Sequence, residues 1–147
     1  MNTTETKMKF AEWLSAEEMH KNSKSWLTEL SFIKDEHLFF EDLIKSFTIQ
    51  LLGEKDFIDI KEIIDAVNRS EKENNMLIEA IKVHESDLQI MIDGIDQPKE
   101  EEGYKKEHRE LITMISDYLK NYKKLKAQLF EIISKIMKNE KMQRLLK

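Results

Sequence analysis

Apolar side chains recur at alternating intervals of four and three residues along the first third of the chain. Nine successive steps of this alternation connect Met19, Ser23, Trp26, Leu30, Ile33, His37, Phe40, Ile44, Phe47 and Leu51. An α-helix with this spacing carries its apolar side chains in one stripe, which packs against the stripe of a neighbouring helix as in a coiled coil. The spacing therefore predicts one long helix, over residues 16–52, that packs lengthwise against other helices.

Two further segments repeat this pattern. In the second segment the stripe contains Phe57, Ile60, Ile64, Val67, Glu71, Asn74, Ile78, Ile81, Glu85, Leu88, Ile92 and Ile95. In the third it contains Tyr104, His108, Leu111, Ile115, Tyr118, Tyr122, Leu125, Leu129, Ile132 and Ile136. We expect helices over 57–95 and 98–142. Only three Gly and one Pro occur in 147 residues, which is typical of long helices joined by few turns and excludes an all-β fold.

Local signals indicate where these helices begin and end. Ser15 followed by Glu18 forms a capping box at the start of the first helix. Gly53 is a typical stop signal, and Asp56 can cap the second helix after a connection of only a few residues, so the first two helices must run antiparallel. Pro98 suits the first position of the third helix. We therefore predict an all-α, antiparallel up-down-up bundle of three long helices with coiled-coil-like packing.

A polar run in the second helix leaves one alternative open. Residues 68–75 read Asn-Arg-Ser-Glu-Lys-Glu-Asn-Asn, and a break there would produce a four-helix bundle. The run contains neither Gly nor Pro, and the apolar stripe resumes in phase after it, so we expect a continuous helix. In this interpretation residues 15–147 form a single domain, and residues 1–14 form a flexible N-terminal segment.

Charge is distributed unevenly along the chain. Residues 104–147 contain 12 Lys or Arg and 5 Asp or Glu, a net charge of +7; since the whole chain carries −5, residues 1–103 carry −12. A basic helix beside two acidic helices favours the correct pairing of the three. A nucleic-acid surface would need exposed aromatic side chains or a free basic face, and the acidic remainder would repel phosphate, so we expect no nucleic-acid partner.

The composition also limits the kinds of site the chain can form and indicates where in the cell it is located. The chain has no Cys, which excludes disulfides, thiolate zinc sites and cysteine nucleophiles. The first eleven residues lack the pattern of a signal peptide, and no apolar segment approaches the length of a membrane-spanning helix. We expect a cytoplasmic protein without a membrane partner.

The four histidines are the residues with the most evident site chemistry. In an antiparallel bundle, His20, His84 and His108 lie near one end. Glu17 and His20 have the Glu-x-x-His spacing found in ferritin-like di-iron bundles, but the second such pair is missing. One metal ion bound by Glu17, His20, His84 and His108 is the alternative function. A histidine that flanks a helical stripe more often has a packing role, so we predict no metal-binding, catalytic or cofactor-binding residue.

His37 occupies the stripe at mid-length, level with Glu71 of the second helix. We expect a buried polar layer of His37, Glu71 and Asn74 with Tyr122 or Lys126. Such a layer typically fixes the register of neighbouring helices. The functional alternative is that His37 and Glu71 form an acid–base pair, which would need a cavity.

The segment Trp26-Leu-Thr-Glu-Leu-Ser-Phe-Ile-Lys-Asp-Glu36, together with His108-Arg-Glu, resembles small helical-bundle proteins of Bacteroidetes-type bacteria, over roughly a third of the chain. That group has no assigned activity, so the resemblance implies only a bacterial, soluble, all-helical protein. The arrangement is also similar to a spectrin-type repeat, which is an analogy of architecture and carries no function.

Five apolar residues fall outside the stripes: Leu38, Phe39, Ile49, Ile58 and Met114. A thin three-helix rod leaves such residues uncovered, and we expect them to close a homodimer. The sequence thus predicts a non-enzymatic interaction or scaffold protein that binds a protein partner or its own copy. We expect no cofactor and no small-molecule substrate.

Overall fold

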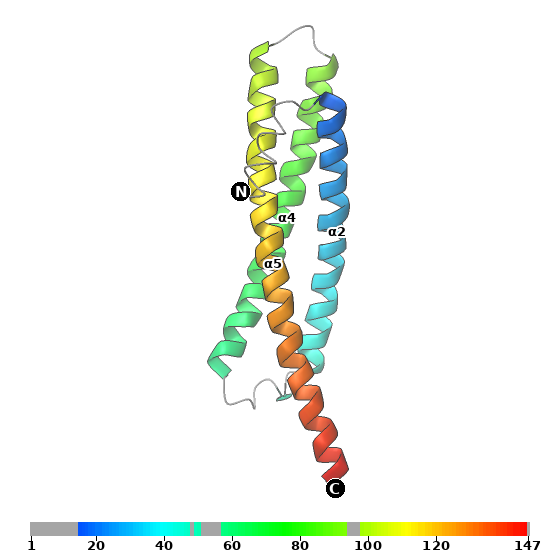
Figure 1. The fold of residues 1–147 in the computed structure, drawn as a ribbon, viewed down its shortest axis with the longest axis vertical. Coiled ribbons are helices and arrows are strands. Elements are labelled where there is room, and N and C mark those ends of the chain that lie inside the picture. Colours follow the sequence, from blue (N-terminus) through cyan, green and yellow to red (C-terminus); the bar gives the residue numbers. More distant parts are fainter. Residues whose placement is uncertain (1–14, 48, 51–56, 94–97, 147) are drawn as a thin grey trace, which may run out of the picture.

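The computed structural model describes residues 15–47, 49–50, 57–93 and 98–146. Three long helices make up almost all of this part: α2 (Ala16–Ser46), α4 (Phe57–Asp93) and α5 (Pro98–Leu146). They lie side by side as an antiparallel rod, with α4 packed against both α2 and α5 (Figure 1). The predicted all-α bundle of three helices is confirmed.

The start of α2 has the predicted cap. The Ser15 side chain accepts a hydrogen bond from the backbone N–H of Glu18 at 3.2 Å. This bond satisfies one of the N–H groups that have no partner within the first turn of a helix. Glu17 and Glu18 add negative charge at the positive end of the helix dipole, which stabilises the same turn.

The end of α2 comes earlier than the stripe suggests. The helix ends at Ser46, because the backbone of Phe47 leaves the helical region at φ −110° and ψ 17°. The Ser46 hydroxyl donates to the carbonyl oxygen of Asp42 at 2.9 Å, a local bond that competes with the helical ladder. Of the expected remainder up to residue 52, positions 48, 51 and 52 lie outside the described residues, as does the expected flexible segment 1–14.

The polar run at 68–75 does not interrupt α4. The helix is continuous from Phe57 to Asp93, so the four-helix alternative is wrong. Ser70 and Asn74 are buried, whereas Asn68 and Lys72 face solvent. Polar side chains therefore take two core positions without disturbing the helical backbone. Residues 94 and 95, which we expected to belong to this helix, lie outside the described residues.

The third helix begins at Pro98 as predicted and continues to Leu146, four residues beyond the expected end. Phe40 of α2 packs against Phe130 of α5 with ring centroids 5.5 Å apart. Because α2 and α5 run in the same direction (Figure 1), Ser46, six residues after Phe40, lies near the level of residue 136. Residues 137–146 therefore project about 15 Å past α2, at 1.5 Å per residue. Figure 1 shows this end of α5 extending beyond the other helices.

The apolar core runs along the whole rod. Its largest cluster occupies the middle and includes Leu30, Ile81 and Ile115, all almost fully buried. A smaller cluster closes the end where α2 begins, and another, around Ile60 and Ile136, closes the opposite end. The expected off-stripe residues Leu38, Phe39, Ile49 and Met114 are exposed, and the side chain of Ile58 lies outside the described residues.

Replacing Ile81 with Ala should lower the free energy of unfolding by about 2–5 kcal/mol, because the side chain is 0% exposed and its removal leaves a cavity. Ile90→Ala on the same helix is the matched control, since this isoleucine is 69% exposed. We expect the control to change stability by less than about 0.5 kcal/mol. Urea unfolding followed by circular dichroism measures both; equal losses would contradict the observed core.

Candidate functional site

A stack of four rings joins the three helices at the end where α2 begins. His84 of α4 and His108 of α5 are fully buried, with ring centroids 5.1 Å apart. Tyr104 stacks on His84 at 4.0 Å, and Trp26 of α2 packs on His108 at 4.9 Å. The stripe positions of Tyr104 and His108, one helical turn apart, bring both rings of α5 onto His84.

Hydrogen bonds through the two imidazoles run in one direction. His84 Nδ1 lies 2.8 Å from Glu107 Oε1, and an ionised carboxylate only accepts, so Nδ1 carries the proton. The bare Nε2 of neutral His84 then accepts from His108 Nδ1 at 2.9 Å. His108 Nε2 in turn accepts from the Asn22 amide at 3.3 Å. Every ring nitrogen therefore has a suitable partner while both histidines are neutral.

The hydrogen-bonded series Glu107–His84–His108–Asn22 does not readily accept an additional proton. Burial, and secondarily the neighbouring His84, lower the pKa of His108 to about 4. Protonated His108 would direct an N–H from Nε2 at the amide hydrogens of Asn22, so the amide would have to turn. The hydrogen bonds of this series therefore favour the neutral form of His108.

His20 and Glu17 do not join this chain. His20 Nδ1 is hydrogen-bonded to a carboxylate oxygen of Glu85, and Glu17 lies on the surface beside Lys21, at 3.8 Å. In the part of the chain that the structure describes, no three His, Asp or Glu side chains are grouped so that they could hold a metal ion. The alternative metal site of Glu17 with three histidines is thus not assembled, although His84 and His108 do meet as the sequence suggested.

A lowered histidine pKa makes folding sensitive to acid. The folded state disfavours the charged form, so the unfolded chain binds more protons below its own pKa of about 6.5, and stability falls as the pH drops toward 4. Between pH 7 and pH 5 we expect a loss of about 2 kcal/mol from His108. Urea unfolding at several pH values measures this loss.

The variant His108→Gln should be less stable at pH 7 and should lose less stability on acidification. Met114→Gln, an exposed change on the same helix, is the control and should retain the wild-type pH dependence. Equal slopes for all three proteins would exclude His108 as the source. Comparing slopes isolates His108 from Glu36, whose pKa is lowered, and from Glu71, whose pKa is raised.

The second buried polar group lies at mid-length. His37 Nε2 is 3.0 Å from Ser70 Oγ, which is 3.1 Å from the Tyr118 hydroxyl. The Tyr118 hydroxyl donates its only hydrogen to the carbonyl oxygen of Ser70 at 3.0 Å, so it must accept from Ser70 Oγ. Ser70 Oγ in turn accepts from Nε2–H of His37. Burial lowers the pKa of His37, and a backbone hydrogen bond with Ile33 offsets part of that effect.

This polar layer has different members from those expected. Glu71 does not bind His37; it shares a hydrogen bond with Glu41 of α2, which together with partial burial raises the pKa of Glu71. The predicted His37–Glu71 pair is wrong because Ser70, one residue earlier, points into the core at that level. Asn74 is buried as expected, and its amide donates to the carbonyl oxygen of Leu30 at 3.0 Å.

Both residues proposed from α5 form hydrogen bonds with Glu36 rather than with His37, although the ring of Tyr122 packs edge-on against that of His37 at 5.4 Å. The Tyr122 hydroxyl donates to Glu36 Oε1 at 2.8 Å, and the Lys126 ammonium binds Oε2 of the same carboxylate. Burial alone would raise the pKa of Glu36, but the hydrogen bonds from Lys126 and Tyr122 outweigh it and lower the pKa below its usual value. Glu36 therefore links α2 to α5 beside the buried layer.

An open groove of about 360 Å³ between α4 and α5 reaches this layer from outside. Its lining residues are Ala66, Arg69, Ser70, Glu73, Tyr118, Asn121, Tyr122, Lys124, Leu125 and Gln128. Ser70 and His37 resemble a nucleophile and base only in composition. His37 donates to Ser70 and so cannot accept the serine proton in this arrangement. The geometry favours a structural role for the layer.

Ser70→Ala should lower the free energy of unfolding by about 1–3 kcal/mol, because it leaves Nε2–H of His37 buried without an acceptor. The double variant His37→Leu with Ser70→Ala should recover most of that loss, since both partners are then apolar. Chemical unfolding of Ser70→Ala, of His37→Leu and of the double variant, compared with the wild-type protein, completes a double-mutant cycle. Additive losses would contradict the direct bond between these side chains.

Neither the families of known proteins, nor the curated proteins, nor the solved structures contain a match to this chain. None of the described helices combines the length and the apolar character needed to cross a membrane. Function is therefore inferred from the geometry of the surface and of the buried polar groups.

Proposed function

We propose that the bundle is a non-enzymatic interaction module that binds a helix of a protein partner, with a second copy of the chain as the first candidate. The carrying observation is a set of exposed apolar side chains where α2 and α5 meet: Phe32, Phe39, Phe130 and Met137. We call this set the aromatic patch. Isolated apolar residues are common on surfaces, but a contiguous group marks interaction sites.

Phe39 of α2 and Phe130 of α5 pack on the same buried ring, which places the two rows of the aromatic patch beside each other. The ring of Phe39 lies 6.2 Å from that of Phe40, and the ring of Phe40 lies 5.5 Å from that of Phe130. Phe40 is fully buried, so the patch extends outward from the core. Phe32 precedes Phe39 by seven residues and Met137 follows Phe130 by seven. Two turns separate each pair, so the patch extends about 10 Å along each helix.

A surface formed by two packed helices suits a further helix. An amphipathic helix that docks there would place its own apolar side chains between the two rows, as neighbours do in helical bundles. Burial of a phenylalanine contributes about 1.5–3 kcal/mol, so two or three such residues can supply a large part of a binding free energy. This supports binding by apolar contact as the main activity of the surface.

The engagement of the buried polar groups supports binding over catalysis. Both ring nitrogens of His84 and of His108 already have hydrogen-bond partners. The remaining candidate pair, His37 and Ser70, has its hydrogen bond oriented against proton abstraction from the serine. These groups account for the register of the helices without any reaction.

We expect the wild-type protein to sediment as a dimer at micromolar concentrations, and Phe32→Ser with Phe39→Ser to shift it to the monomer mass of 17.6 kDa. The apolar area lost at each position should raise the dissociation constant at least about tenfold. Leu38→Ser is the matched control, since Leu38 and Phe39 are both 53% exposed but lie about 100° apart around α2. Sedimentation equilibrium measures all three proteins.

A monomeric wild-type protein would overturn self-association. A photoreactive phenylalanine analogue at position 39, compared with one at position 38, then tests for a different protein partner in cells. Crosslinking that is specific to position 39 supports the aromatic patch. Equal crosslinking, or none, at the two positions overturns the proposal.

A further inference from the structure

Six lysines line the outer side of the C-terminal half of α5. We call this surface the basic face: Lys120, Lys123, Lys124, Lys135, Lys138 and Lys141. At 3.6 residues per turn, the six positions fall within an arc of about 120°. The buried residues of the same segment, including Leu125, Leu129 and Ile136, lie on the opposite side. All six lysines are exposed, and none forms an ion pair with any described residue.

This concentration of charge is confined to one half of the helix. Residues 98–119 contain four Lys or Arg and six Asp or Glu, whereas residues 120–146 contain eight and two. Glu131 is the one acidic residue within the arc of the basic face, and Glu140 lies on the other side, where its carboxylate binds Gln50. The positive charge is therefore nearly uncompensated over about 32 Å of helix, from Lys120 to Lys141.

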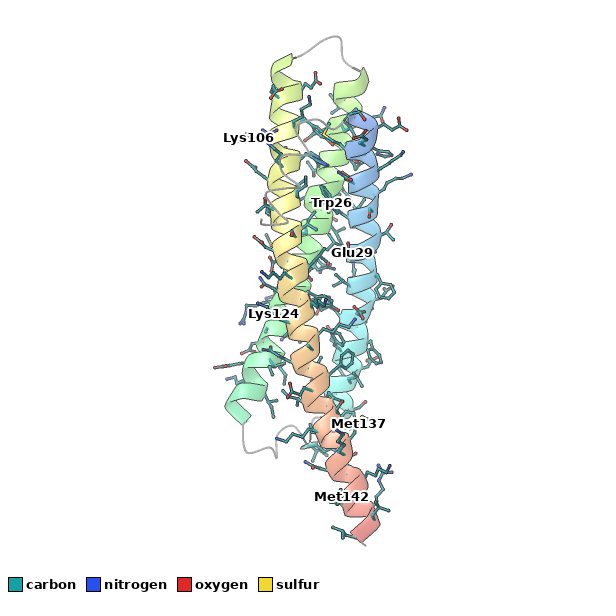
Figure 2. The ribbon with its side chains drawn as sticks, in the orientation of Figure 1. Trp26, Glu29, Lys106, Lys124, Met137 and Met142 are labelled. Atoms are coloured by element: carbon teal, nitrogen blue, oxygen red, sulfur yellow. The ribbon has the colours of Figure 1, made fainter. Side chains whose placement is uncertain are left out.

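Exposed apolar residues continue the basic face along the last turns of α5. Met142, Leu145 and Leu146 fall in nearly the same arc and are 57%, 72% and 81% exposed. They belong to the part of α5 that projects beyond α2, and Figure 2 shows Met142 on this projection. An amphipathic segment with lysines along its length and leucines at its end is typical of peripheral contact with a lipid surface.

The acidic helices do not cancel the field of the basic face. The three helices pack side by side, so α2 and α4 lie behind α5 at the usual interaxial distance of about 8–10 Å. Charges separated by more than about 8 Å are largely screened at physiological ionic strength. An anionic surface in contact with the basic face therefore experiences the lysines more strongly than the carboxylates behind them; Glu73, which lines the groove together with Lys124, is an acidic residue of α4 at its edge.

We propose that the basic face binds peripherally to an anionic lipid surface, with the lysines at the headgroups and Met142, Leu145 and Leu146 entering the interface. The inference is independent of the aromatic patch. It also revises our expectation of no membrane partner, which rested on the lack of a spanning segment. A nucleic acid fits less well, because it would leave the apolar end without a role, and because the exposed rings of the described residues lie in the aromatic patch on the flank rather than along the basic face.

The test is sedimentation of the full chain with vesicles of phosphatidylcholine that contain phosphatidylserine, compared with vesicles of phosphatidylcholine alone. We expect binding only to the anionic vesicles and a decline as salt is added. Each lysine near an anionic bilayer contributes about fivefold to the partition coefficient. Leu145→Ser with Leu146→Ser should also weaken binding, because the inserted apolar area is lost.

Two triple variants remove the same charge from different places. The first alters the basic face: Lys120→Gln, Lys124→Gln and Lys138→Gln. The second alters exposed lysines of α2 and α4 that also lack ion pairs with described residues: Lys24→Gln, Lys61→Gln and Lys72→Gln. We expect the first triple to reduce the partition coefficient about a hundredfold and the second to leave it within about threefold. Circular dichroism confirms that both remain helical.

Three results would overturn the proposal: no binding to anionic vesicles even at low salt, equal losses for the two triples, or binding to duplex DNA that displaces the protein from the vesicles. Phe32→Ser with Phe39→Ser should retain vesicle binding. Loss of dimerisation and loss of lipid binding are therefore distinguishable.

Discussion

Burial of the apolar stripe of α4 is the interaction on which the rest of the structure depends. This helix packs against both α2 and α5, and its residues Val67, Leu77 and Ile81 lie at the centre of the main cluster. A heptad stripe alone, however, does not determine alignment, because a shift of seven residues places apolar side chains on apolar side chains again. The buried polar groups supply the missing specificity. A one-heptad slip of α4 would separate His37 from Ser70 and His84 from His108, and each buried group left unpaired costs about 1–3 kcal/mol.

The periodic spacing of the sequence was sufficient to predict the helices, their antiparallel order and the level at which distant residues meet. The proximity of His84 and His108 followed from counting residues away from the turn. The spacing did not show which of two adjacent residues of α4 points into the core at the level of His37. Ser70 and Glu71 differ by one residue and hence by 100° around α4, so Ser70 reaches His37 while Glu71 meets Glu41. The partner of Lys126 could not be predicted either, because its long side chain reaches Glu36 at the edge of the layer.

The exposed surfaces were harder to predict than the core, because they depend on which two helices adjoin. Leu38 and Phe39 both fall off the apolar stripe and are equally exposed, and Phe39 packs on Phe40, whose ring contacts Phe130 of α5. Phe130 lies on the flank of the stripe in its own helix, and only the contact of α2 with α5 makes it part of a patch. The net charge of the third helix was evident from composition. That this charge lies on one outer face could be seen only once the structure showed which side of α5 is buried.

The buried polar groups and the exposed surfaces overlap only at the middle of the rod. The ring stack of His84 and His108 and the polar layer of His37 lie toward the end where α2 begins and at the middle, where three helices surround them. The aromatic patch and the basic face begin at the level of this layer, since Phe32 and Phe39 lie on either side of His37 along α2, and they continue to the projecting end of α5. Among the described residues, Ile60 and Ile136 form the buried cluster at that end, with Ile44, Phe47, Ile64 and Ile132 packed against it. The polar groups farther along the rod hold the helices in register, so contacts made by the projecting end of α5 need not disturb the fold.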